Sequence, residues 1–269
     1  HVTDEVEPET KGSKQTDNLQ YLSARLESLH KYAVRYHGLE PLSESLLEHT
    51  KAQKHWFVLN PDSASLVANA GKISAAFVAD VKVVDPNVEI KQSTILNTSP
   101  YLIYWDDSLH TVNIPMWSQV IPPQQEFFYK LAGSQENGKK VFGLFFNGFY
   151  LVHELGHAIE WSERAKGNKM TSSIYESEEF ANELAILYWR KKGYSKELKE
   201  CYDNAKVMLA KLENPVPKGE DMLSFFSKNY EELTQDPYKY GFFQFDQFVR
   251  LYDASAKGTF EEFLKTKLK

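Results

Sequence analysis

One segment, residues 145–161, constrains this chain more than any other. It reads FFNGFYLVHELGHAIEW, and its apolar flanks contain no proline, so it predicts a buried helix. His153 and His157 are four residues apart, which is about 400° of α-helix, so both rings lie on one face, one turn apart. Burying both rings and Glu154 in so apolar a helix is costly unless they are paired or bind a metal.

Two imidazoles at this spacing can share one tetrahedral zinc ion, each at about 2.0–2.1 Å. Glu154, one residue along, lies beside such an ion, where it can take a proton from a coordinated water. Gly156 leaves room for a second element to approach the helix closely. The alternative interpretation is two core histidines satisfied by hydrogen bonds, with Glu154 at a helix–helix junction.

A second helix is predicted in the segment 173–190, and it can supply the third ligand that such a site needs. Ser173 and Glu176 form a capping-box pattern that starts a helix, and Gly193 follows its end. Three carboxylates in this segment are candidates for the third ligand: Glu178, Glu179 and Glu183.

Glu178 is favoured as the third ligand because of the helix face on which it lies. That face also carries Ala181, Asn182 and Ala185, small residues that allow close packing against Gly156. Asn182, one turn beyond Glu178, can accept the free ring N–H of a ligand histidine. Glu179 and Glu183 lie one turn apart on another face of the helix, and the simpler interpretation is that this face is exposed to solvent. They remain the alternative third ligands.

The motif and its spacing resemble the gluzincin zinc peptidases, the thermolysin-like branch of the zincins. In that family H-E-x-x-H lies on one helix and a glutamate ligand follows on a second; here Glu178 comes 21 residues after His157. The family often places an Asp or Asn one turn after that glutamate, as Asn182 stands here. The resemblance covers residues 141–190, and the metzincin branch is excluded because Glu163 occupies the position of its third histidine.

The resemblance implies a zincin-like α+β fold, mostly helical with a small β-sheet, and zinc-dependent hydrolysis of peptide bonds. His153, His157 and Glu178 would then hold Zn²⁺, with Glu154 as the base and Asn182 behind the ligands. Two alternatives stay open. One is a zinc-binding scaffold protein that keeps the fold without turnover, and the other is a metal-free helical domain in which the motif arose by chance.

Composition agrees with one enzyme-sized globular unit. The chain has 269 residues, 42% of them hydrophobic, and a net charge of −6. No basic cluster interleaves with aromatic residues, so the expected partner is a peptide or protein substrate and not nucleic acid. The longest apolar run, residues 141–152, is too short for a transmembrane segment, and Cys201, the only cysteine, excludes a thiolate-rich metal site.

Residues 1–17 are polar without an apolar period and predict a disordered lead. The remainder, 18–269, is expected to form one domain with a helical part at 18–90, a hairpin and metal-site core at 91–193, and a second helical part at 194–269. A polar lead of this kind favours export, to a secreted or periplasmic location. The sequence leaves the oligomeric state open.

Periodicity and capping signals predict the other helices. They fall at 18–36, 43–59, 62–81, 122–135, 195–212 and 222–233, with a last short helix capped by Thr259. Asn137-Gly138 is expected to be a turn, and the polar segment 162–172 a mobile loop at the rim of the site.

A β-hairpin is predicted before the site, with strands at 101–105 and 110–114 around the turn Asp106-Asp107-Ser108. In the zincins the edge strand of the small sheet pairs with extended substrate, and an open strand edge can bind a peptide backbone in this way. A purely structural hairpin is the equal alternative.

The most aromatic stretch, residues 236–252, is expected mainly to pack in the core, with a wall of the site as the alternative. Thermolysin-like enzymes add a Tyr or His donor from this side of the chain to stabilise the oxyanion. No histidine follows His157, and a predicted turn between Asp236-Pro237 and Gly241 would present Tyr238 and Tyr240. These tyrosines are therefore the candidate donors.

Overall fold

The computed structural model describes Leu26 and residues 57–90, 93–96 and 102–268. The expected lead at 1–17, the helix expected at 18–36 except Leu26, and most of the helix expected at 43–59 lie outside the described residues and stay predictions. From Phe57 onward the chain packs as one unit, which contains the whole candidate site.

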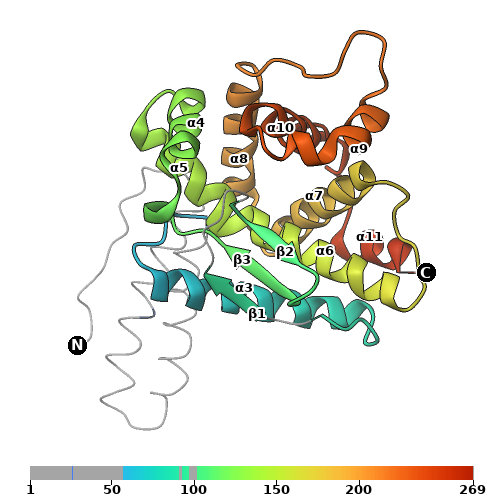
Figure 1. The fold of residues 1–269 in the computed structure, drawn as a ribbon. Helices are drawn as coiled ribbons and strands as arrows, with labels where there is room; N and C mark the ends of the chain where they lie inside the picture. The colour runs from blue at the N-terminus through green and yellow to red at the C-terminus, as the bar shows by residue number, and fades with distance from the viewer. Residues whose placement is uncertain (1–25, 27–56, 91–92, 97–101, 269) are drawn as a thin grey trace, which may run out of the picture. The chain divides into compact units, whose positions relative to one another are not determined.

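The described chain is mostly helical with one small sheet, which confirms the expected α+β class (Figure 1). In chain order the elements are α3 (Ser63–Val84), β1 (Ser93–Leu96), β2 (Tyr104–Asp106), β3 (Thr111–Ile114), the 3₁₀ turn η1 (Trp117–Gln119), α4 (Pro122–Ala132), α5 (Gln135–Leu144), the π-helical turn η2 (Phe145–Phe149), α6 (Tyr150–Ala165), α7 (Ile174–Lys191), α8 (Ser195–Leu209), α9 (Met222–Leu233), α10 (Pro237–Ala254) and α11 (Phe260–Lys267).

Several helices begin at side-chain caps, of which Asp221 is not predicted from the sequence. In each, a serine, threonine or aspartate accepts a hydrogen bond from a backbone N–H of the first turn, as N-caps do. These caps are Asp62 for α3, Ser173 for α7, Asp221 for α9 and Thr259 for α11. The predicted helices at 62–81, 173–190 and 222–233 are therefore confirmed, and the helix predicted at 195–212 ends earlier, at Leu209.

The sheet has the strand order β1-β3-β2. β2 and β3 form the predicted hairpin, antiparallel with Trp105 opposite Val112. Each strand is shorter than expected, and Asp106, expected in the turn, is the last residue of β2 and pairs with Thr111. β1 pairs with β3 in parallel. β1 contacts α3, whereas β2 and β3 contact α6, so the sheet lies beside the helix that carries the two histidines (Figure 1).

The expected turn at Asn137-Gly138 is wrong, because both residues lie inside α5. The chain turns earlier, at Gly133, whose φ of 87° requires the left-handed conformation that glycine adopts readily. Gly138 serves another purpose. A Cβ there would lie 2.7 Å from the Tyr129 ring, so the glycine lets α5 pack closely against α4.

The helix expected at 145–161 begins as a π-helical turn and continues as α6. The segment before α3 lies directly on this turn. A Cβ at Gly148 would lie 2.7 Å from the Phe57 ring, and Asn147 Oδ1 accepts hydrogen bonds from the backbone N–H of Asn60 at 2.8 Å and from its side chain at 3.1 Å. Close backbone packing and buried amides therefore fix the start of the histidine helix.

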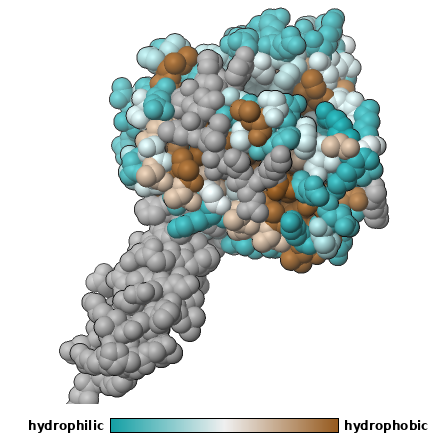
Figure 2. All heavy atoms as spheres, turned by 60° about the horizontal axis from the view of Figure 1, so that its bottom comes forward, coloured by the Kyte–Doolittle hydropathy of each residue, from teal (hydrophilic) through white to brown (hydrophobic). Residues whose placement is uncertain are grey.

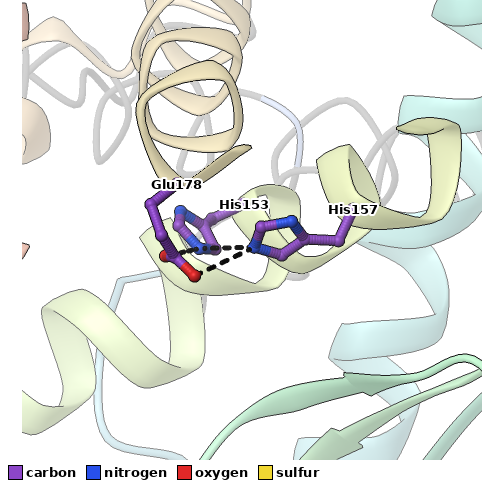
Figure 3. A group of neighbouring side chains, drawn as sticks. All are labelled: His153, His157 and Glu178. Atoms are coloured by element: carbon purple, nitrogen blue, oxygen red, sulfur yellow. Dashed lines mark hydrogen bonds and ion pairs between the residues drawn. The ribbon is translucent and has the colours of Figure 1, made fainter. Parts of the chain in front are cut away.

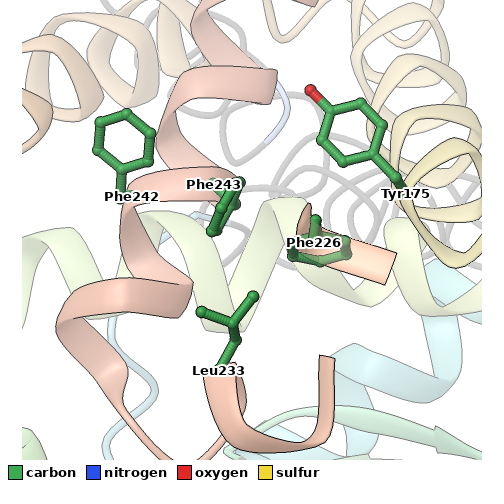
Figure 4. Packing of buried hydrophobic residues seen from close by; sticks show 5 residues of the cluster. All are labelled: Tyr175, Phe226, Leu233, Phe242 and Phe243. Atoms are coloured by element: carbon green, nitrogen blue, oxygen red, sulfur yellow. The ribbon is translucent and has the colours of Figure 1, made fainter. Parts of the chain in front are cut away.

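The aromatic stretch at 236–252 forms α10, and the turn expected around the two tyrosines is wrong. Asp236 caps the helix by accepting from the N–H groups of Tyr238 and Lys239, and Pro237 occupies its first position, where a missing N–H costs nothing. The helix packs in the core as expected. Phe242 and Phe243 join Tyr175, Phe226 and Leu233 in one buried cluster between α7, α9 and α10 (Figure 4).

Helix α3 has the length and mean hydropathy of a membrane span, and 44% of that window is buried. A helix in a protein core has the same two properties, and α3 contacts β1, α6 and α11 along its buried side. On the face that Figure 2 shows, hydrophilic residues predominate among the described ones, and apolar residues are scattered between them.

Candidate metal centre

His153, His157 and Glu178 converge on one point, with three ligand atoms within 4.8 Å of one another. His153 Nε2 lies 3.2 Å from His157 Nε2 and 3.3 Å from Glu178 Oε2, and His157 Nε2 lies 3.8 Å from Glu178 Oε1. Figure 3 shows the carboxylate reaching from α7 towards both rings on α6. The structure thus brings together the three residues that the sequence predicts as ligands.

The two helices can lie this close because small residues meet where they cross. A Cβ at Gly156 would lie 3.1 Å from Ala181 Cα and 3.3 Å from Ala181 Cβ, closer than most Cβ atoms approach a neighbour, so a larger residue would push the helices apart by a few tenths of an ångström. The predicted packing of Gly156 against the small face of the second helix is therefore confirmed. This contact sets the distance between the histidines on α6 and Glu178 on α7.

The hydrogen bonds behind the rings decide which ring nitrogens face the site. His153 Nδ1 lies 3.0 Å from Asn182 Oδ1. Asn182 Nδ2 donates to Gln247 Oε1 at 3.2 Å, so Oδ1 is the acceptor and His153 Nδ1 carries the proton. His157 Nδ1 lies 3.2 Å from Ser177 Oγ. With both Nδ1 atoms engaged, both Nε2 atoms face Glu178.

Lone pairs from two imidazoles and a carboxylate repel one another unless a cation lies between them. Ligands about 2.0–2.1 Å from a tetrahedral zinc ion stand about 3.3 Å apart, and the three separations here are 3.2, 3.3 and 3.8 Å. The residues present therefore fit a divalent metal, and this buried group could hold a metal ion.

Electrostatics around the group also favour a positive charge at this point. His153 is 3% exposed and Glu178 4% exposed. Burial alone would raise the pKa of Glu178, but the hydrogen bond with His153 and the charge of the His157 ring hold it at about 2. Burial would lower the pKa of His157, yet Glu160, Glu178 and Glu154 together raise it to about 9. The carboxylates thus attract a cation, whether a proton or a metal.

Glu154 is buried beside the group and is held by the sheet. Its Oε2 accepts a hydrogen bond from the backbone N–H of Trp105 in β2 at 2.8 Å. Burial raises the pKa of Glu154, while the charges of His153 and His157 oppose that rise. The edge strand and the histidine helix are thereby joined at the carboxylate that the sequence predicts as the base.

The other two candidate ligands lie elsewhere. Glu179 pairs with Arg250 Nη2 at 2.7 Å. Glu183 is half-buried and does not belong to the group of three. Among the three candidate carboxylates of α7, the helix phase inferred from the sequence therefore selects the one that reaches both histidines.

The group opens into a cleft of about 1450 Å³, more than most small-molecule pockets enclose. Strand β2 lines one side of it with Tyr104 and Trp105, and α10 lines another, as the alternative interpretation of the aromatic stretch proposed. The loop expected at 162–172 also contributes, with residues 167–173 along the rim, although its first residues belong to α6.

The two predicted tyrosines occupy different places. Tyr240 lines the cleft, and Gln244 Nε2 donates to its hydroxyl at 2.9 Å. Tyr238 is 39% exposed, does not line the cleft and packs its ring edge-on against Phe127 at a centroid distance of 5.0 Å. The structure therefore gives a place at the site to Tyr240 and not to Tyr238.

Sequence reasoning missed four polar residues that surround the ligands. Gln244 Nε2 donates to Glu178 Oε2 at 2.8 Å, and Tyr230 lines the same cleft as Glu178 and Tyr240. The other two are Glu160 and Ser177, near His157. The one signal in the sequence was the pair of glutamines three residues apart, Gln244 and Gln247, within an otherwise aromatic helix.

No protein-family model, curated protein or solved structure matches this chain. The geometry and chemistry of the site are therefore the basis for inferring a function, since a fold alone does not determine an activity.

Proposed function

We propose that this chain is a gluzincin-type metallopeptidase with a zincin-like fold, and that it hydrolyses peptide bonds with the help of zinc. The observation that carries the proposal is the convergence of three lone-pair donors in an open cleft, with Glu154 fixed beside them. Two imidazole nitrogens and one carboxylate oxygen are a ligand set typical of catalytic zinc, which keeps one position open. Zinc held by His153, His157 and Glu178 would supply a Lewis acid and acidify water.

Glu154 supplies the base. Trp105 N–H fixes one carboxylate oxygen, so the group stays oriented and keeps acceptor capacity for a water in the cleft. Its buried position raises its pKa towards the range in which a base can accept a proton and later release it. Glu154 takes the proton of the attacking water and returns it to the leaving amine.

Strand β2 supports a peptide as substrate. It is an edge strand of the described sheet, it lies along the cleft, and its Trp105 N–H is turned away from β3 towards the site. An extended peptide laid beside such an edge can form main-chain hydrogen bonds and carry its scissile carbonyl to the metal. This is the role that the resemblance to the zincins implies for the hairpin.

The test is hydrolysis of a labelled unfolded protein by zinc-loaded wild type and by Glu154→Gln. The amide is nearly isosteric but cannot accept the proton, so we expect zinc to be retained and cleavage to fall by about 10²–10⁴-fold. Glu163→Gln, which changes an equally buried carboxylate of α6 outside the ligand group, is the matched control and should cleave normally. A wild-type protein that binds zinc and cleaves nothing would instead support the scaffold alternative.

A further inference from the structure

Glu160 is a buried carboxylate on α6 that the proposed hydrolysis does not use. It is 4% exposed and lines the cleft. It accepts hydrogen bonds from the hydroxyls of Ser177 on α7 and Thr171 on the rim loop, residues 167–173. It also lies 3.9 Å from His157 Nδ1 and 3.4 Å from Arg164 Nη2.

The direction of these hydrogen bonds follows from the single proton of a hydroxyl. Ser177 donates that proton to Glu160, so its lone pair is left to accept from His157 Nδ1–H at 3.2 Å. His157, Ser177 and Glu160 thus form one chain of hydrogen bonds that ends on a carboxylate. This chain places the ring proton on Nδ1 and leaves the Nε2 lone pair facing the metal position.

The two histidines are consequently supported in different ways. His153 donates to the neutral amide of Asn182, which is fully buried. His157 donates to a hydroxyl whose partner is a carboxylate, and a carboxylate behind a ligand histidine raises the basicity of the ring as well as orienting it.

The same carboxylate also holds the rim loop. Thr171 is part of the segment that lines the cleft and donates its hydroxyl proton to Glu160. The position of the loop and the orientation of His157 therefore depend on one shared acceptor.

We propose that Glu160 and Ser177 are positioning residues for the metal ligand His157, and that Thr171 couples the rim loop to them. This inference rests on the proposed function only in requiring that the three-residue group binds zinc. It assigns no role in proton transfer to Glu160.

Glu163 provides a matched control on the same helix. It is also 4% exposed, and it accepts hydrogen bonds from Lys166 Nζ at the end of α6 at 2.8 Å and from Asn168 Nδ2 in the rim loop at 2.7 Å. It is bonded to the loop as Glu160 is, but it is not part of the chain that reaches His157. Glu163→Gln therefore changes a carboxylate of the same burial on the same helix without touching the hydrogen-bond chain that reaches His157.

The experiment measures the affinity for Zn²⁺ by competition with a chromophoric chelator, together with the melting temperature of each metal-free protein. Glu160→Gln and Ser177→Ala should each bind zinc about 10–100-fold more weakly, which is the usual effect of removing a hydrogen-bond partner of a metal ligand. Ser177→Thr keeps the hydroxyl and should restore most of the affinity, which a merely structural defect would not allow. Glu163→Gln should stay within about twofold of wild type, because nothing behind the ligand changes.

Thr171→Val tests the coupling to the loop. It removes one hydrogen bond to Glu160 and leaves Ser177 in place, so zinc affinity should fall by roughly 2–10-fold. Unchanged affinity in this variant would overturn the link between loop and ligand.

The outcomes separate this inference from the proposed function. If wild type binds zinc and Glu160→Gln binds it equally well, or Glu163→Gln loses as much, the positioning role is overturned while the metallopeptidase proposal stands. If Ser177→Thr binds as weakly as Ser177→Ala, the hydroxyl is not the link. If wild type binds no zinc at all, the proposed function itself fails.

Discussion

Helices α6 and α10 both bury polar side chains among aromatic rings, but the two sets differ in chemistry. The polar groups that α6 buries are largely ionisable, and they include His153, Glu154 and Glu160. α10 buries two neutral amides, Gln244 and Gln247. Burying a charge costs far more than burying an amide, so the ionisable set needs a compensating cation or partner, whereas the amides need only hydrogen bonds.

The amides of α10 supply hydrogen bonds to the ligand residues. Gln244 donates to Glu178, and Gln247 accepts from Asn182, which in turn accepts from His153. The ionisable groups of α6 and α7 therefore form the candidate centre, while Asn182 and the two glutamines of α10 support it. Four predictions test this division, from the largest expected effect to the smallest.

Removal of a ligand should have the largest effect. His153→Ala and Glu178→Ala each leave a two-ligand site, so we expect loss of bound metal in both, measured as zinc content after dialysis against a weak chelator. Glu183→Ala, on the same helix as Glu178, is the control and should keep its zinc. Loss of zinc in Glu183→Ala with retention in Glu178→Ala would show that the helix phase is wrong.

The second variant asks whether α10 also contributes to the chemistry. If the Tyr240 hydroxyl donates to the oxyanion, Tyr240→Phe should lower turnover by about 10²–10³-fold with zinc intact, the usual loss for one such donor. Tyr238→Phe is the paired control, and its turnover should not change because Tyr238 packs on Phe127 outside the cleft. Equal turnover in Tyr240→Phe and wild type would show that the Tyr240 hydroxyl does not stabilise the oxyanion and that α10 only supports the ligands.

The third variant removes the direct support of a ligand. Asn182→Ala deletes the acceptor of the His153 ring proton, so zinc affinity or activity should fall by about 10–100-fold. Chelator competition measures the change. An affinity equal to that of wild type would mean that the packing of α6 against α7 orients His153 without this hydrogen bond.

The smallest effect is expected one step further out. Gln247→Leu removes the acceptor for Asn182 Nδ2 while keeping a side chain of similar size, so about 1 kcal/mol of support is lost. Zinc affinity should fall roughly fivefold. A loss of zinc affinity as large as that of Asn182→Ala would contradict this, because it would show that a hydrogen bond two residues away from the metal matters as much as a direct bond to a ligand.

Much of the site could be predicted from sequence because its determinants are local. The four-residue spacing of His153 and His157 fixes their shared face, and the small residues around Ala181 fix which side of α7 meets Gly156. The helix phase then singles out Glu178. Each of these inferences needs only the regular geometry of an α-helix.

The remaining features depend on tertiary contacts that no local pattern encodes. Gln244 reaches Glu178 across 66 residues of sequence. The dipeptide Asn137-Gly138 is typical of a turn, yet both residues lie inside α5. Glycine is needed at position 138 because Tyr129 of α4 packs where a side chain would be. Tyr238 and Tyr240 have similar neighbours in sequence, and only the phase of α10 directs one of them to the cleft.

The most direct test of the central claim is the metal content of the wild-type protein, measured by elemental analysis after dialysis against a weak chelator. The account predicts about one zinc ion per chain, because the lone pairs of His153, His157 and Glu178 converge at zinc-ligand spacing in a buried site. Protein that folds and contains no bound metal would contradict it.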